Sequence, residues 1–131
     1  MQLPDTVRAA FDAAPCCFLA TCHDGVPNVV PVAHKWIVDN ELLLADIHFG
    51  KTRRNIGENP EVAVSVTGPL PKQGFQLKGS ASVHRSGDLF EKVKALLQEE
   101  GVKAEPHAAV RVPVGEIYLL DPGPDAGKQI L

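Results

Sequence analysis

The short spacing between strand-like segments is the feature that most limits the folds open to this chain. The apolar segments 17–22 and 28–38 are separated by His23-Asp24-Gly25, and Asp-Gly is a strong hairpin signal. Asp39-Asn40 then leads directly into another apolar segment, residues 41–46. Connections this short join antiparallel neighbours, because parallel strands need a crossover of roughly a dozen residues or more. The sequence therefore predicts antiparallel pairing.

The rest of the chain continues this pattern. Three more segments favour strands, namely residues 62–66, 75–84 and 108–120, the last interrupted near Pro113 and Gly115. In segment 28–38, Pro31 suits an edge strand or a bulge better than a central strand. Six strands joined mainly by short turns predict a mainly β fold, a closed antiparallel barrel.

Helices are expected only at the margins of this barrel. Residues 4–14 have apolar side chains at helical spacing, and residues 52–59 form a short polar helix that ends at Asn59-Pro60. Residues 88–100 carry one apolar stripe and stop at Gly101, so we expect this helix to cover an open end of the barrel. Residues 68–74 are predicted to form a turn-rich loop.

Size and charge restrict the function classes. A chain of 131 residues predicts one domain, residues 1–131. The net charge of −3, without a basic run longer than residues 51–54, argues against nucleic-acid binding. No stretch of 18 apolar residues occurs, and the N-terminus lacks a basic and apolar leader, so we expect no membrane insertion and a cytoplasmic protein. Cys16, Cys17 and Cys22 are expected to be reduced thiols.

Residues 42–55 are the most informative segment for chemistry. An apolar strand leads to Gly50, Lys51 and Thr52 at the expected start of a helix. Backbone N–H groups, the helix dipole, the lysine charge and the threonine hydroxyl would together attract a phosphate. Two alternatives remain open: the basic residues simply solvate a helix face, or residues 45–52 form a P-loop whose first glycine is replaced by Ala45. The short chain and the antiparallel spacing argue against the P-loop.

The order of several motifs resembles a known family. These motifs are residues 28–35, Ala45-Asp46, Gly50-Lys51-Thr52, Asn59-Pro60 and residues 74–79. In sequence and spacing they resemble the FMN-binding split β-barrel proteins of the pyridoxamine 5′-phosphate oxidase-like family, over nearly the whole chain. The resemblance implies a six-stranded antiparallel split β-barrel with short flanking helices, a homodimer, and FMN at the subunit interface.

The resemblance also assigns residues to the cofactor. The second strand of the barrel should pass the flavin ring and ribityl chain, the phosphate grip should lie around the start of the second helix, and one residue of the long following strand should reach the flavin. The implied cofactor-binding residues are Pro31, Val32, Ala33, His34, Lys35, Ala45, Asp46, Lys51, Thr52 and Gln76. Lys35 is a candidate for stabilising the reduced flavin near N1.

Other readings of individual side chains are less favoured. The five histidines lack metal-ligand spacing, so no metal site is expected, although His34 and His48 flank the proposed flavin segments. Trp36 could stack on a flavin or pack structurally, and we favour packing. No GxSxG motif is present, which argues against a hydrolase.

The implied function is an FMN-dependent oxidoreductase that passes electrons or a hydride between a small-molecule donor or a redox protein and an acceptor. No catalytic residue can be named. The alternative is a non-enzymatic FMN protein that carries electrons or stores flavin, and a deazaflavin is the alternative cofactor. Vitamin B6 oxidation is not expected, because the sequence lacks the arginine-rich segment that the oxidase itself has after the position of Leu120.

Overall fold

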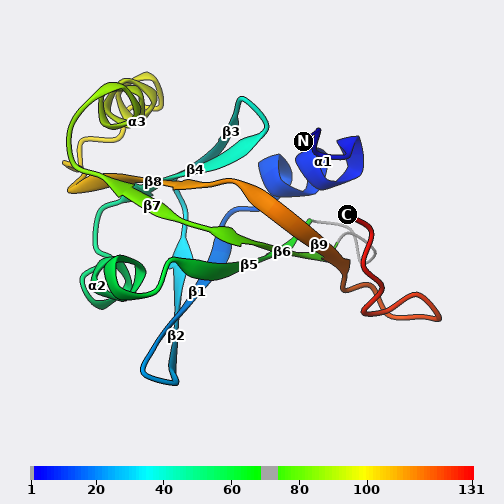
Figure 1. Cartoon of the computed structure of the whole chain (residues 1–131). Coiled ribbons are helices and arrows are strands. Elements are labelled where there is room, and N and C mark those ends of the chain that lie inside the picture. The colour runs from blue at the N-terminus through cyan, green and yellow to red at the C-terminus, as the bar shows by residue number, and fades with distance from the viewer. Residues whose placement is uncertain (1, 69–73) are drawn as a thin grey trace.

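The chain forms the two antiparallel sheets drawn in Figure 1, and an apolar core lies between them. This is a computed structural model, and it describes residues 2–68 and 74–131. One sheet has the strand order β2-β1-β5-β6-β9 and the other β3-β4-β8-β7. The larger sheet consists of β1 (Cys17–His23), β2 (Val26–Val32), β5 (Glu61–Thr67), β6 (Gly74–Ser80) and β9 (Val114–Leu119); the smaller of β3 (Lys35–Val38), β4 (Glu41–Asp46), β7 (Ser82–His84) and β8 (Ala108–Val112).

Both predicted hairpin turns are present. β1 and β2 pair antiparallel up to His23 opposite Val26, which leaves Asp24 and Gly25 as a two-residue loop. Asp39 and Asn40 join β3 to β4 in the same way. All four turn residues have positive φ, as two-residue hairpin loops of this kind require. All the strand pairs in the described part of the chain are antiparallel, which removes the P-loop alternative.

The prediction of a mainly β antiparallel barrel is confirmed, and the strand count differs for one reason. Three segments predicted as single strands, residues 28–38, 75–84 and 108–120, each break once, so the described residues form nine strands. Each break carries the chain from one sheet to the other, and these crossings close the split barrel. The break after β6 follows a register shift at Gly79, where a Cβ would lie 2.1 Å from the carbonyl oxygen of Pro113. Only glycine allows this close approach.

The barrel core lies between the sheets and is closed at one end by helix α1 (Asp5–Ala13). Alternate residues of the strands, such as Leu19, Val64 and Leu77, are fully buried there. Val7 and Phe11 of α1 belong to the same apolar cluster. Helix α1 is therefore the element that covers the end of the barrel.

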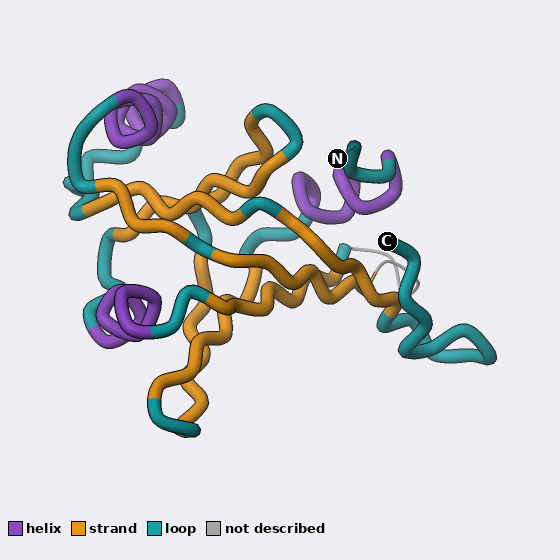
Figure 2. Tube along the Cα trace, viewed as in Figure 1, coloured by secondary structure: helices purple, strands orange, loops and turns teal. Residues whose placement is uncertain are grey.

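Helix α3 (Asp88–Glu99) lies elsewhere than we predicted. Its buried residues Val93 and Leu97 pack with Leu43 and Ala109 in a separate cluster, on the outer face of the smaller sheet. In Figure 2, α3 lies beside the strands of this sheet and away from α1. The apolar stripe predicted the helix correctly, but a stripe carries no information about which surface it will cover. Trp36 packs against this second cluster, and its Nε1 donates to Glu100 at 2.6 Å, which confirms a structural role.

The remaining helix, α2 (Lys51–Glu58), follows β4 after a short loop. It ends before Asn59-Pro60, as the sequence predicts. Of the helices in residues 2–68 and 74–131, none combines the length and the apolar character needed to cross a membrane. The predicted turn-rich loop 68–74 lies mostly outside the described residues.

Candidate functional site

A cavity of about 460 Å³ lies where the chain passes from the larger to the smaller sheet. Its walls come from the end of β2, the end of β4, the loop before α2 and the segment after α3. The backbone N–H of Ala45 donates to the carbonyl oxygen of His34 at 3.0 Å and holds two of these segments together. The lining residues are Val30, Pro31, Val32, Ala33, His34, Ala45, Ile47, His48, Phe49 and Ala104.

A second cavity, of about 510 Å³, lies between the β1–β2 hairpin and α2. It differs from the first cavity in carrying lysine, arginine, aspartate and glutamate side chains, which the first cavity lacks. Lys51 lies at the first position of α2, where the helix dipole adds to its positive potential. The lining residues are His23, Asp24, Val26, Pro27, Asn28, Lys51, Arg54, Asn55 and Glu58.

The loop between β4 and α2 connects the two cavities. His48 and Phe49 line the first cavity, and Lys51 lines the second. Gly50, between them, has a φ of +46°, which is a left-handed conformation that favours glycine. The two cavities thus lie on either side of the stretch from Phe49 to Lys51 and share no lining residue.

Asp46 fixes the shape of this loop. Its side chain is fully buried, and its carboxylate accepts hydrogen bonds from the Phe49 N–H at 3.0 Å and from Arg53 at 2.6 Å. A carboxylate would repel a phosphate, but here its charge is already paired with the guanidinium. Asp46 therefore positions the loop, and its side chain does not line either cavity.

Thr52 also has an internal partner. Its hydroxyl is buried and accepts a hydrogen bond from the Asn28 side-chain amide at 2.9 Å. This contact joins the start of α2 to strand β2. Thr52 thus holds Asn28, which lines the second cavity, in place. Of the neighbours Lys51 and Thr52, only Lys51 is exposed.

Lys35 points toward α1. Its ammonium donates to the carbonyl oxygen of Phe11 and lies 4.6 Å from the centre of the Phe11 ring. Cys17 lies close enough for the Lys35 charge to act on it, yet burial dominates and raises the pKa of the Cys17 thiol to about 12. Lys35 therefore fastens α1 to the barrel and does not line the cavity beside His34.

Gln76 is not brought together with the other predicted residues. It lies on the outer face of the larger sheet, in one cross-strand row with Pro31, Phe18 and Ser65. Three strand spacings separate it from Pro31, about 14 Å. Within one chain, Gln76 is thus too far from the first cavity to line it.

The structure adds site residues that the sequence argument missed. Phe49 and Ile47 complete the apolar wall, and their position beside Lys51 could have suggested them. Ala104 lies far away in the sequence, and no local signal marks it. In the part of the chain that the structure describes, no group of three or more histidine, cysteine, aspartate or glutamate side chains is placed to hold a metal ion.

These features define a split-barrel protein with an apolar cavity and an exposed helix-start lysine beside it. The chain belongs to the pyridoxamine 5′-phosphate oxidase family, whose model matches residues 3–121. An uncharacterized protein of Methanocaldococcus jannaschii is 37% identical over 117 residues, which are 86% of this chain and 78% of that protein.

Solved structures share the fold at lower sequence identity. HupZ of Group A Streptococcus has a TM-score of 0.83 and 22% identity, over 96% of this chain and 100% of that one. An FMN-binding protein of Syntrophomonas wolfei has a TM-score of 0.72 and 13% identity, over 91% and 86%. A heme binding protein of Mycobacterium smegmatis has a TM-score of 0.67 and 16% identity, over 89% and 54%.

Proposed function

We propose that this protein binds FMN in the groove formed by the two cavities and passes electrons or a hydride through it. The observation that carries the proposal is the meeting of Pro31–His34 with Ala45 in one apolar cavity, next to the exposed Lys51. These residues are distant in sequence, and all were expected around the flavin from the family resemblance. Membership of the oxidase family and the FMN-binding neighbour support the same cofactor.

The chain's own groups suit the two ends of FMN. The apolar walls from Val32 and Phe49 would accept the ring, and Lys51 with the first N–H groups of α2 would hold the phosphate. His34 and His48 line the first cavity, and each could donate a hydrogen bond to the flavin ring or move a proton there. FMN, when bound, supplies the redox chemistry.

The proposal includes a homodimer, which the family resemblance implies. It leaves two roles for the bound flavin: an oxidoreductase that uses a small-molecule donor, or a carrier that exchanges electrons with a redox protein. Rapid bleaching of bound FMN by one small donor, such as a reduced nicotinamide, would support the enzyme. Reduction only by a protein donor would support the carrier.

Heme is the second candidate ligand. Two imidazoles, from His34 and His48, line the apolar cavity, and neutral imidazole is a common ligand of heme iron. The heme binding protein of Mycobacterium smegmatis has the same fold. FMN is favoured because the chain belongs to the oxidase family and because a helix start with Lys51 at its first position suits a phosphate.

The test is a titration of the purified protein with FMN, a deazaflavin and heme, each followed by visible absorption and by quenching of ligand fluorescence where the ligand fluoresces. We expect saturation near one FMN per chain and a shifted flavin spectrum. Tighter binding of the deazaflavin or of heme than of FMN would overturn the proposal in favour of that ligand. A protein that ignores FMN altogether would also overturn it.

A further inference from the structure

The second cavity is larger than one phosphate requires. Its volume of about 510 Å³ lies within the range of roughly 300–1,000 Å³ that is typical of small-molecule sites. In the proposed function, Lys51 and the first N–H groups of α2 hold the FMN phosphate. The lining of the cavity continues along α2 as far as Glu58, the last residue of the helix. Much of the cavity therefore has no ligand group assigned to it.

One face of α2 carries the functional groups of this cavity. The lining residues of the helix are Lys51, Arg54, Asn55 and Glu58. Residues three, four and seven positions after Lys51 lie on the same side of a helix as Lys51 itself. At 1.5 Å per residue, Arg54 lies about 4.5 Å and Glu58 about 10.5 Å beyond Lys51 along the helix axis. The cavity thus presents two cations in succession and then a carboxylate.

The two cations are available to a ligand. Within residues 2–68 and 74–131, no ion pair engages the Lys51 ammonium or the Arg54 guanidinium. Arg53 differs, because its charge is paired with Asp46. Like charges one turn apart repel each other, and the positive end of the helix dipole adds to this repulsion. Two linked phosphates would relieve the repulsion at both cations.

A nearly buried amide adds a hydrogen-bonding group of fixed orientation. Asn55 is only 7% exposed, although it lines the cavity. Its side-chain nitrogen donates to the hydroxyl of Thr21 on β1 at 3.0 Å. In the part of the chain that the structure describes, no side chain donates to its oxygen. Because such an oxygen needs a donor, it favours a ligand that carries one.

The β1–β2 hairpin forms the facing wall and adds an apolar surface. Its lining residues are His23, Asp24, Val26, Pro27 and Asn28. Val26 is 66% exposed, so a flat apolar group against this wall would remove it from water. An aromatic base suits this wall. Asp24, like Glu58 on α2, accepts hydrogen bonds from hydroxyl or amino groups.

The mixture of charges selects among anionic ligands. A ligand with negative charge along its whole length would be repelled by Asp24 and Glu58. A nucleotide carries its charge on the phosphates and presents neutral hydrogen-bond donors on the ribose and the base. Carboxylates bind ribose hydroxyls in many nucleotide sites. Two cations followed by a carboxylate therefore match a nucleotide with two linked phosphates.

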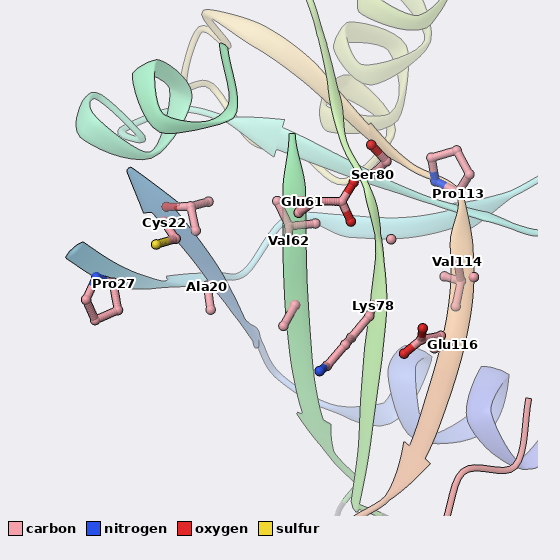
Figure 3. Close-up of a pocket in the computed structure, with 14 residues that line it drawn as sticks. Ala20, Cys22, Pro27, Glu61, Val62, Lys78, Ser80, Pro113, Val114 and Glu116 are labelled. Carbon is pink, nitrogen blue, oxygen red and sulfur yellow. The ribbon is translucent and has the colours of Figure 1, made fainter. Parts of the chain in front are cut away.

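The cavity drawn in Figure 3 lacks this pattern. It has a volume of about 750 Å³ and shares only Pro27 with the second cavity. Among its described lining residues, Lys78 is the one lysine or arginine, and the carboxylates of Glu61 and Glu116 share the cavity with it. A diphosphate is thus matched by the second cavity and not by the larger one.

We propose that the second cavity binds a nucleotide, with Lys51 and Arg54 on two linked phosphates, Glu58 on the ribose hydroxyls and the hairpin wall against the base. Two sources share this chemistry: the adenosine phosphate half of FAD, and a separate nucleotide that binds beside FMN. The assignment to FAD rests on the proposed function, because FAD contains FMN. The nucleotide site itself does not rest on it.

Titration calorimetry with ADP tests the site. ADP should bind the purified protein at about one per chain. AMP and inorganic diphosphate should each bind at least about tenfold more weakly, because AMP lacks the second phosphate and diphosphate lacks the ribose and the base. A protein that ignores ADP, or that binds diphosphate as tightly as ADP, would overturn the proposal.

Variants locate the bound ADP. Arg54→Ala should weaken ADP binding about 10- to 150-fold, the range for one charge-assisted hydrogen bond. Glu58→Gln should weaken the binding of ADP and leave that of diphosphate unchanged. Arg85→Ala is the matched control, because Arg85 is also exposed and lies outside this cavity. Equal ADP affinities of the Arg54 and Arg85 variants would overturn the site.

Titrations with FAD and FMN distinguish the two sources. If the nucleotide belongs to FAD, FAD binds at least about tenfold tighter than FMN, and Arg54→Ala removes this difference. If the nucleotide is separate, FAD binds no tighter than FMN, and the FMN-saturated protein still binds ADP. Equal affinities for FAD and FMN, together with an FMN-saturated protein that ignores ADP, would overturn both sources.

The two proposals fail in different ways. A protein that ignores flavins but binds ADP through Arg54 overturns the proposed function and supports the nucleotide site. A protein that binds FMN, ignores ADP and binds FAD no tighter than FMN overturns the nucleotide site and supports the proposed function.

Discussion

Replacing Lys51 with alanine should weaken FMN binding and leave the fold intact. Lys51 is exposed at the first position of α2, and within the described residues no hydrogen bond or ion pair holds its ammonium. All of its charge is thus available to the phosphate. A charge-assisted hydrogen bond contributes about 1.5–3 kcal/mol. We therefore expect the Kd for FMN to rise about 10- to 150-fold.

The same change should not destabilise the protein. The N-terminus of a helix is its positive end, and the first turn of α2 has no acidic residue to offset the lysine. Removing the cation should stabilise the free protein by about 0.3–1 kcal/mol, a rise of about 1–4 °C in Tm. Weaker binding together with equal or higher stability separates a lost contact from a damaged fold.

Isothermal titration with FMN and differential scanning calorimetry without ligand measure the two effects. Lys92→Ala on α3 is the control, because Lys92 is also exposed and lies outside both cavities. Lys51→Arg should keep most of the affinity, because the charge remains. An unchanged Kd for Lys51→Ala at saturable binding would refute the phosphate assignment. A lowered Tm would refute the helix-dipole argument.

Three further predictions concern stability. Gly79→Ala should lower the free energy of unfolding by at least about 1–3 kcal/mol in urea denaturation, because its Cβ would lie 2.1 Å from the Pro113 carbonyl oxygen. Asp46→Asn should lower the free energy of unfolding by about 1–3 kcal/mol in the same assay, because the neutral amide would no longer offset the charge of Arg53. Burial raises the pKa of Cys17 from 9.0 to about 12, so the native state holds the thiol proton more tightly than the unfolded state does. The free energy of unfolding should therefore fall as the pH rises from 9 toward 12. Cys17→Ala should flatten this fall in thermal melts.

Each of these changes has a matched control. Gly115→Ala should be tolerated, because the nearest atom to a Cβ there is 3.9 Å away, and equal losses at both glycines would contradict the clash. Glu41→Gln breaks a more exposed pair with Arg111 and should cost less than about 1 kcal/mol. A larger loss there than at Asp46 would contradict the argument from burial. Cys22→Ala, a change at a cysteine that is only partly buried, is the control for the alkaline slope.

Local signals predicted most of the secondary structure. The two hairpin turns and the alternating strands are confirmed, because a two-residue turn and a two-residue period involve only neighbours in sequence. The end of α2 before Asn59-Pro60 is confirmed for the same reason. Of the three strand breaks, at residues 33–34, Ala81 and Pro113, the sequence marked only the one near Pro113. Ala81 resembles any small strand residue, and its N–H donates to the carbonyl oxygen of Pro60, which is distant in the sequence.

The sequence named candidate site residues but could not show how they are arranged. The order of motifs indicated Pro31–His34, Ala45 and Lys51 as cofactor-binding residues, and this role stays a prediction. The tertiary structure shows only that these residues line two cavities. Charge and residue type could not show that Asp46 pairs with Arg53, or that Lys35 binds the Phe11 carbonyl, because both partnerships depend on how separate elements pack.

The sequence by itself thus determined the antiparallel class, the turns, the helices and the family, since these follow from short-range geometry and from the order of motifs. Only the tertiary structure decided which sheet each half-strand joins, which polar side chains have internal partners, and which sheet face remains uncovered. Those outcomes depend on contacts between residues far apart in the chain, such as Gly79 against Pro113, and no local pattern encodes such a contact.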